Sequence, residues 1–161
     1  MRESSQSRVT GRERSTARFF AVQALFQMEA RGQSCAEVVE EFLNHRFGHS
    51  FDEVAILVGD ADLFAKLVND AITFQALIDQ MTERALVSGW PIARIDPTLR
   101  GIFRAASAEL LGRESPPKVI INEFIDIARA FFLEGREVKF VNAVLDTIAR
   151  DVQERLNGFA D

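Results

Sequence analysis

Cysteine, membrane-length apolar runs and catalytic motifs are scarce or absent in this 161-residue sequence, and each shortage excludes a class of protein. The single cysteine, Cys35, rules out an intramolecular disulfide and a cysteine-based zinc cluster. No apolar run approaches the roughly 20 residues that a membrane-spanning helix needs. The charged N-terminus lacks the apolar segment of a secretory signal. We therefore expect a cytoplasmic protein without a membrane partner.

Candidate catalytic and metal-binding residues are also few. The sequence contains no phosphate-binding glycine loop, no zinc-protease helix motif and no nucleophile elbow. His45 and His49 have the spacing of a metal-ligand pair, but no third ligand is evident, so solvated histidines are the preferred interpretation. Glu109 and Glu123 could be paired carboxylates, although such residues are more often helix-surface acids or partners of a neighbouring arginine. We therefore expect that the protein is not an enzyme and that it has no metal site and no cofactor.

The apolar residues follow a helical period along nearly the whole chain. With 47% apolar and 27% charged residues, the composition is that of an ordinary globular domain. Apolar residues recur at three- and four-residue steps, and no segment alternates with period two for long enough to need a sheet. The segment from Phe19 to Met28 is apolar on almost every side, which is typical of a helix at the centre of a bundle.

Capping and breaking residues divide this pattern into helices. Thr10 and Glu13 have the spacing of a capping box, with Ser15 as an alternative cap. A second box begins at Ser34, a long helical pattern extends over residues 63–81, and Asp96 precedes a proline at a first helical position. The sequence therefore predicts an all-α bundle of six or seven helices joined by short loops.

The first eighteen residues concentrate positive charge in an acidic protein. They hold five arginines and two glutamates, so the rest of the chain has a net charge of −8 against −5 for the whole. If a helix starts near Gly11, Arg14 and Arg18 lie one turn apart on one face. Arginine binds phosphate bidentately, whereas cations at a helix N-terminus oppose its macrodipole. Composition leaves open whether this segment binds phosphate or is a solvated terminus.

Three stretches, taken together, resemble the NusB family of transcription antitermination factors. They are ARFFAVQALFQMEARGQS (17–34), KVIINEFIDIARAFF (118–132) and KFVNAVLDTIAR (139–150). The resemblance covers about residues 11–155 and implies a compact, non-catalytic bundle of two three-helix halves. It also implies binding of boxA RNA in ribosomal RNA transcripts together with the ribosomal protein NusE. The family acts with other Nus factors in an RNA polymerase complex that reads through terminators. We expect a flexible basic tail at residues 1–10 and one RNA-binding domain at 11–157.

The resemblance further implies an RNA-binding site. Arg14 and Arg18 match family arginines at the start of the first helix, and Arg12 lies in the same segment. The motif residues Lys139, Phe140 and Asn142 match by residue type, and Phe26 is the remaining candidate. Phe26 stands where the family often has tyrosine, so core packing is as good an interpretation as RNA contact. Phe140 either packs in the core or stacks on a base. Asn142 either forms an interhelical hydrogen bond or reads a base.

The sequence is also consistent with a second class of function. A helical protein-interaction module could bind a ribosomal protein while having little RNA affinity of its own. The acidic remainder of the chain would suit a basic partner by electrostatic complementarity. RNA affinity of the isolated protein would separate the two functions.

Overall fold

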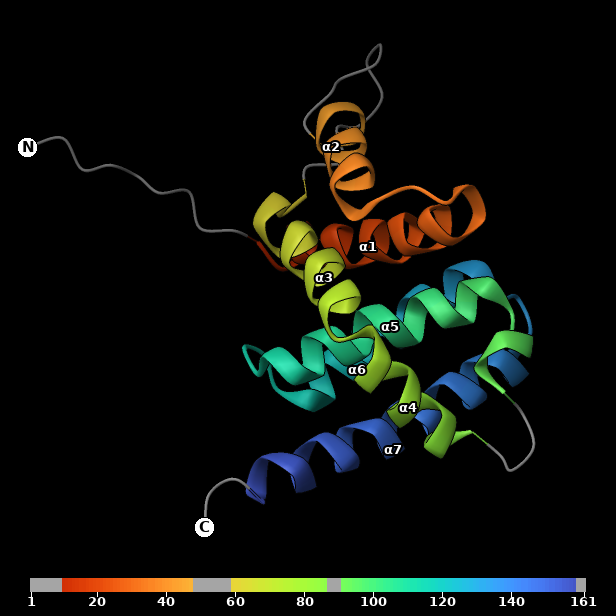
Figure 1. Ribbon diagram of the computed structural model, residues 1–161. Helices are drawn as coiled ribbons and strands as arrows, with labels where there is room; N and C mark the ends of the chain where they lie inside the picture. Colours follow the sequence, from red (N-terminus) through yellow and green to blue (C-terminus); the bar gives the residue numbers. More distant parts are fainter. Residues whose placement is uncertain (1–9, 48–58, 87–90, 159–161) are drawn as a thin grey trace, which may run out of the picture.

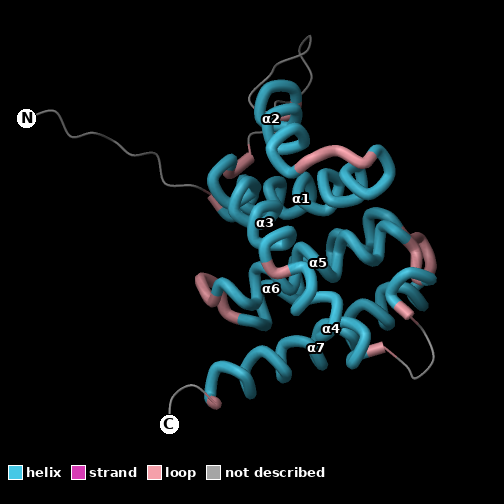
Figure 2. Tube along the Cα trace, viewed as in Figure 1, coloured by secondary structure: helices cyan, strands magenta, loops and turns pink. Residues whose placement is uncertain are grey.

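The computed structural model describes residues 10–47, 59–86 and 91–158, which form seven α-helices and one short 3-10 helix (Figure 1). In chain order they are α1 (Gly11–Arg31), α2 (Cys35–His45), α3 (Ala61–Thr73), α4 (Gln75–Ala85), η1 (Ile92–Arg94), α5 (Pro97–Gly112), α6 (Pro117–Phe131) and α7 (Gly135–Asn157). The described ranges contain no strand (Figure 2). The prediction of an all-α bundle of six or seven helices is confirmed.

Polar side chains cap three of these helices where the sequence predicted it. Thr10 Oγ1 accepts a hydrogen bond from the backbone N–H three residues later at 3.2 Å, so Thr10 and not Ser15 begins α1. Ser34 Oγ does the same for α2 at 3.2 Å. Asp96 caps α5 through a backbone N–H at 2.7 Å. Each cap satisfies one of the N–H groups that a helix N-terminus leaves without an internal partner.

Helix α1 lies at the centre of the bundle, as its apolar surface predicted. It contacts α2, α3, α5 and α6. The contact with α5 is close because α5 carries Gly101 where the two helices meet. A Cβ atom at that position would lie 3.1 Å from the carbonyl oxygen of Val22, which is tighter than an ordinary contact. A side chain at this position would therefore press on the backbone of α1 at the crossing.

The long helical pattern of residues 63–81 is divided into two helices at Phe74. Phe74 ends α3 and begins α4, with φ −104° and ψ 17°. Helix α3 packs on α1, α2 and α5, whereas α4 packs on α5, α7 and η1. One straight helix could not cover both sets of neighbours. The bend turns two parts of one apolar stripe toward different partners.

The helices form two groups that meet at α5. In Figure 1, α1, α2 and α3 lie on one side of α5, and α4 and α7 lie on the other. Helix α5 contacts α1, α3, α4, α6 and α7. Its apolar residues are buried along most of its length. The structural halves are thus α1–α3 and α5–α7, with α4 packed across the second.

Candidate nucleic-acid interface

The predicted arginines at the start of α1 differ in their accessibility. Arg12 is exposed and forms no ion pair with another described residue. Arg14 is half-buried, and its Nη2 donates a hydrogen bond to Ser115 Oγ at 2.8 Å. A neutral hydroxyl is its only side-chain partner in the described part of the chain, so the guanidinium keeps its positive charge uncompensated. Arg2 and Arg8 of the basic segment lie outside the described residues.

Arg18, predicted as a phosphate contact, is a buried and ion-paired side chain in the structure. Its side chain is 4% exposed and donates two nearly parallel hydrogen bonds to Glu109, from Nε at 2.6 Å and from Nη2 at 3.0 Å. Glu123 lies 3.6 Å from Nη1. Burial by itself lowers the pKa of Arg18, but the hydrogen bond and negative charge of Glu109 outweigh it and raise the pKa. The guanidinium thus joins α1 to α5, and Glu109 is the partner of an arginine rather than half of a catalytic pair.

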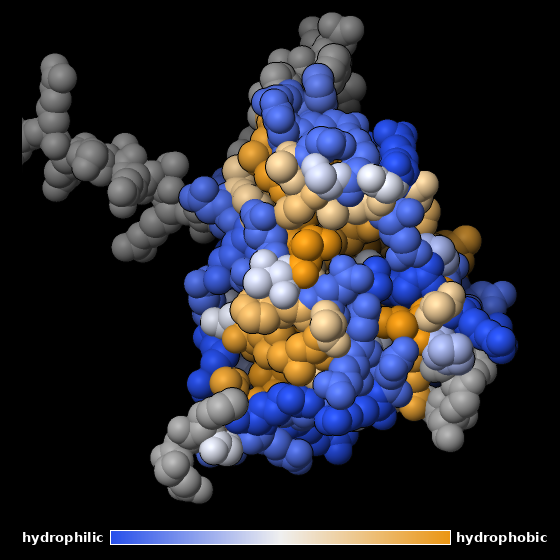
Figure 3. Space-filling view, viewed as in Figure 1, coloured by the Kyte–Doolittle hydropathy of each residue, from blue (hydrophilic) through white to orange (hydrophobic). Residues whose placement is uncertain are grey.

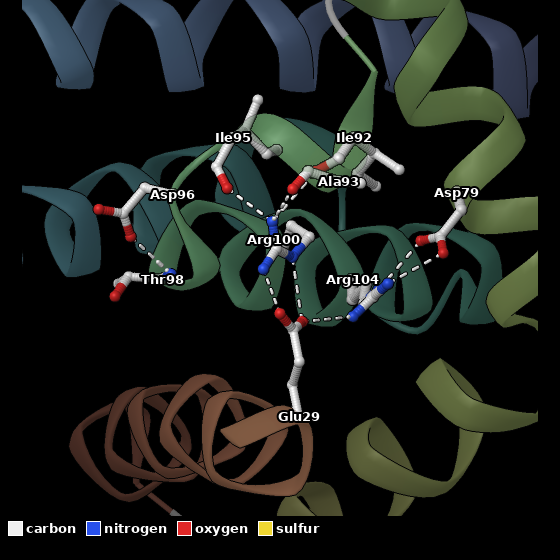
Figure 4. A network of polar contacts seen from close by, with 9 residues as sticks. All are labelled: Glu29, Asp79, Ile92, Ala93, Ile95, Asp96, Thr98, Arg100 and Arg104. Carbon is white, nitrogen blue, oxygen red and sulfur yellow. Dashed lines mark hydrogen bonds and ion pairs between the residues drawn. The ribbon is translucent and has the colours of Figure 1, made fainter. Parts of the chain in front are cut away.

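Two further arginines are occupied by the same kind of contact (Figure 4). Arg100 is hydrogen-bonded to Glu29 and also donates to the Ile95 carbonyl at 2.6 Å. Arg104 binds Asp79 through two hydrogen bonds of 3.0 Å and reaches Glu29 at 3.2 Å. The hydrogen bond from Arg100 lowers the pKa of Glu29. These guanidinium groups fasten α5 to α1, α4 and the η1 segment, which leaves them few donors for a ligand.

Phe26 lies on the surface beside a second exposed phenylalanine. Most large apolar side chains are buried, and the face drawn in Figure 3 is largely hydrophilic with separate apolar areas. Among the described phenylalanines only Phe26, Phe74 and Phe131 are exposed, by 42%, 45% and 38%. Phe26 and Phe131 line one groove of about 340 Å³ along α1, which residues of α2 and α6 border. Phe131 is held there by stacking on Phe19, with ring centroids 5.5 Å apart and planes 13° from parallel.

Two cations and an unpaired amide line the same groove. They are Arg31 at the end of α1, Arg46 after α2, and Gln23 on α1. Neither arginine forms an ion pair with a described carboxylate, although Arg46 lies over the ring of Phe42 at 5.0 Å. Gln23 Oε1 is buried and accepts no hydrogen bond from the described residues. The groove therefore combines aromatic faces and positive charge, which is the chemistry of a site for unstacked bases.

The residues of the KFVN motif at the start of α7 take different positions. Lys139 is exposed and forms no ion pair with a described residue. Phe140 is half-buried and meets Phe103 edge-on at 5.9 Å, so much of its ring packs on the core. Asn142 is exposed, and its side chain makes no hydrogen bond within the described ranges. The expected interhelical hydrogen bond of Asn142 is thus not observed there.

The predicted residues do not form one compact pocket. Arg14 and Phe26 are twelve residues apart on α1, which corresponds to about 18 Å along the helix axis. The sequence also did not indicate Phe131, Arg31 or Arg46 as neighbours of Phe26. In the sequence, Arg31 is an ordinary cation in the last turn of a helix, where the macrodipole favours positive charge. The packing of α6 and α2 against α1 brings Phe131 and Arg46 to Phe26.

The structure offers no support for a metal ion or a membrane span within the described ranges. No three His, Cys, Asp or Glu side chains gather there in a way that could hold a metal, and no described helix is long and apolar enough to cross a bilayer. His45 is exposed at the end of α2, and His49 lies outside the described residues.

Known proteins with similar sequences and structures point to one family. The NusB family model matches residues 15–150. The transcription antitermination protein NusB of Caulobacter vibrioides is 44% identical over 142 residues, which cover 88% of this chain and 95% of that protein. T. maritima NusB superimposes with a TM-score of 0.69 at 29% identity, covering 88% of this chain and 92% of that one.

A second solved structure contains partners as well. It is the crystal structure of antitermination factors NusB and NusE in complex with dsRNA, which matches with a TM-score of 0.72 at 25% identity over 88% of this chain and 99% of that one. The family match covers most of the sequence and agrees with the observed fold. The chain therefore belongs to the NusB family, whose members are transcription antitermination factors and not enzymes.

Proposed function

We propose that this protein binds boxA RNA of ribosomal RNA transcripts together with the ribosomal protein NusE. In this proposal it acts in the bacterial cytoplasm, within an antitermination complex of RNA polymerase and other Nus factors. The observation that carries the proposal is the groove along α1, bordered by α2 and α6, where exposed Phe26 and Phe131 lie beside Arg31 and Arg46. We refer to it as the aromatic groove.

The aromatic groove supplies the two contributions that single-stranded RNA needs. Exposed rings stack on bases, and each stacked base contributes about 1–3 kcal/mol. Arg31 and Arg46 can approach the phosphates that connect those bases, because neither forms a direct ion pair with a described carboxylate. Together these groups would hold a short unpaired segment.

Other predicted residues would extend this contact. Arg12 and Arg14 at the start of α1 are suited to phosphate, since both keep donors available at the surface. Lys139 is exposed one residue before Phe140 and would contribute another cation. The half-buried Phe140 would contribute mainly through an edge of its ring.

NusE is the proposed protein partner for two reasons. A solved relative is bound to NusE and RNA in one complex, and the NusB family is identified here over residues 15–150. In addition, the net charge of −5 favours association with a basic ribosomal protein. We expect NusE to increase RNA affinity, because few unpaired cations are available on this protein alone.

Fluorescence anisotropy tests the proposal directly. Labelled boxA RNA and a scrambled RNA are titrated with the protein, with and without saturating NusE. We expect tighter binding of boxA than of the scrambled RNA, and a further gain with NusE. Phe26→Ala should weaken boxA binding by the stacking energy of about 1–3 kcal/mol while leaving the salt dependence nearly unchanged.

A matched variant and a clear contrary result complete the design. Phe74→Ala removes a phenylalanine of similar exposure from the α3–α4 bend, outside the groove, and should leave RNA affinity unchanged. If boxA affinity is undetectable with and without NusE while NusE itself binds, the protein is an interaction module without RNA affinity. If the Phe26→Ala variant binds boxA RNA with the affinity of the wild type, the aromatic groove is not part of the RNA-binding site.

A further inference from the structure

The start of α1 is fixed to two segments that are distant in the sequence. The carbonyl oxygen of Glu13 accepts a hydrogen bond from the backbone N–H of Asp60, just before α3, at 3.0 Å. On the other side, Ser15 Oγ donates to Glu123 Oε2 of α6 at 2.7 Å. Arg14 lies between these two contacts. The backbone that carries Arg14 is therefore held in one place, and only its side chain is left to be oriented.

The side chain of Arg14 is oriented by one neutral acceptor. Its Nη2 donates to Ser115 Oγ at 2.8 Å, and no other hydrogen bond joins the guanidinium to a described residue. Ser115 lies in the loop between α5 and α6, 101 positions from Arg14 in the sequence. A hydroxyl oxygen fixes the direction of a guanidinium without compensating its charge, whereas a carboxylate at the same place would do both. The remaining N–H groups of Arg14 stay available for an anion.

The acids beside Arg14 are held by other cations. Three of them line a small cavity of about 10 Å³ together with Arg14: Asp70, Glu109 and Glu114. Arg18 is ion-paired with Glu109. The Nζ atom of Lys66 lies 3.4 Å from the Asp70 carboxylate and 3.8 Å from the Glu114 carboxylate. Each acid therefore has a cation other than Arg14, and Ser115 can hold Arg14 while its charge remains free.

This arrangement orders the guanidinium before a ligand arrives. An arginine that rotates freely must be immobilised when it binds a phosphate, and ordering one such side chain weakens binding by about two- to twelvefold. Arg12 is in that situation, because its side chain is exposed and makes no hydrogen bond with a described residue. Arg14 differs, since the contact with Ser115 already fixes it.

We propose that Ser115 is a positioning residue for RNA binding, which holds the guanidinium of Arg14 in place for a phosphate of the bound strand. This inference rests on the proposed function. It adds a residue that lies outside the predicted site and outside the three stretches that resemble the NusB family. Ser115 acts through Arg14 and contributes no charge. Its loss should weaken binding without changing the number of phosphates that the protein neutralises.

Three substitutions of Ser115 test this role. Each full-length variant is titrated with labelled boxA RNA at several salt concentrations between about 50 and 200 mM. Ser115→Ala removes the acceptor and should weaken binding about two- to twelvefold, with the salt slope of the wild type. Ser115→Thr keeps a hydroxyl and should bind like the wild type. Ser115→Asp places a carboxylate beside Arg14, so it should weaken binding and also flatten the log-log salt slope by about 0.7, the value of one phosphate contact.

A double-variant cycle shows whether Ser115 and Arg14 act as one unit. Arg14→Ala by itself should flatten the salt slope by about 0.7. Adding Ser115→Ala to Arg14→Ala should cause no further loss of affinity, because the group that Ser115 positions is already absent. The matched control is Thr73→Ala, which removes an exposed hydroxyl about two turns of α3 beyond Lys66 and should leave affinity unchanged. All titrations are made well below the Tm of each variant, so that only folded proteins are compared.

Several results would overturn the role of Ser115. One is wild-type affinity in Ser115→Ala, and another is a Ser115→Thr variant that binds as weakly as Ser115→Ala. An unchanged salt slope in Ser115→Asp would show that the position does not control the charge of Arg14. Equal losses from Ser115→Ala with and without the Arg14 side chain would mean that Ser115 only shapes its own loop.

Failure of the positioning role can be distinguished from failure of the proposed function. If Arg14→Ala has the affinity and salt slope of the wild type while Phe26→Ala weakens binding, the proposed function stands. Arg14 then contacts no phosphate, and Ser115 has nothing to position. If the wild-type protein does not bind boxA RNA with or without NusE, the proposed function itself is wrong, and the role of Ser115 is wrong with it.

Discussion

The buried ion pair between Arg18 and Glu109 predicts that Arg18 stabilises the fold and does not contact RNA. Both side chains are 4% exposed, and the pair connects α1 to α5. Arg18→Ala would leave the Glu109 carboxylate buried without its main partner, a change that costs about 3–5 kcal/mol. In a chain of this length each 1 kcal/mol lowers Tm by about 2–4 °C. We therefore expect Tm to fall by about 6–20 °C.

A double variant separates stability from RNA contact. Arg18→Met with Glu109→Leu replaces the pair by apolar side chains and leaves the net charge unchanged. Replacing a whole buried ion pair in this way is often neutral or stabilising, by about 1–4 kcal/mol. We expect the double variant to melt near the wild-type temperature, and the large coupling between the two substitutions would show that they act as one unit.

Thermal unfolding followed by circular dichroism and RNA titration at several salt concentrations are the two assays. If Arg18 is structural, the double variant binds boxA RNA with the affinity and salt slope of the wild type. A double variant that melts normally but whose salt slope is flatter by about 0.7 has lost one phosphate contact. That result would refute the assignment of Arg18 to the fold and restore it to the RNA site.

Three further predictions concern the packing and charge network around α5. Gly101→Ala places a Cβ 3.1 Å from a backbone oxygen of α1, so chemical denaturation should show a loss of about 1–3 kcal/mol, whereas Gly11→Ala, which has no neighbour within 4 Å, should show none. Phe140→Ala removes the edge-on contact with Phe103 and should lower the stability by more than the roughly 0.5–1.5 kcal/mol of an aromatic pair; an unchanged Tm would mean that the ring is free for RNA. The hydrogen bond from Arg100 lowers the pKa of Glu29 in the folded state. The Glu29 carboxylate therefore stabilises the protein above its unfolded pKa, and this stabilisation is lost as pH falls through the folded pKa. Glu29→Gln should therefore reduce the drop in Tm between about pH 7 and pH 3, and parallel Tm–pH profiles for the two proteins would contradict this.

Cation availability explains why RNA binding is expected to depend on more than one surface. Several arginines near the core, Arg18, Arg100 and Arg104, are held by carboxylates of neighbouring helices. The cations that remain unpaired among the described residues are spread over the start of α1, the aromatic groove and α7. Each surface alone can neutralise few phosphates. A bound strand that touches several of them, or a protein partner that adds contacts, is needed for useful affinity.

The sequence alone determined the helical class and the starts of three helices, α1, α2 and α5. Capping at Thr10, Ser34 and Asp96 is local chemistry, since each side chain satisfies a backbone group two or three residues away. The apolar periodicity likewise identified α1 as the central helix. The resemblance to the NusB family rested on three ordered motifs, and the family match over residues 15–150 agrees with it.

Tertiary structure alone decided where the chain bends and which charges are free. The apolar period continues through Phe74, so only the different neighbours of α3 and α4 reveal the break there. Arg14 and Arg18 share a helix face and a residue type, yet one meets the hydroxyl of Ser115 and the other a buried carboxylate 91 positions away in the sequence. The aromatic groove likewise requires α6 to place Phe131 beside α1. Local patterns specify which residues face inward along one helix, but the availability of a charge depends on side chains that distant segments bring to it.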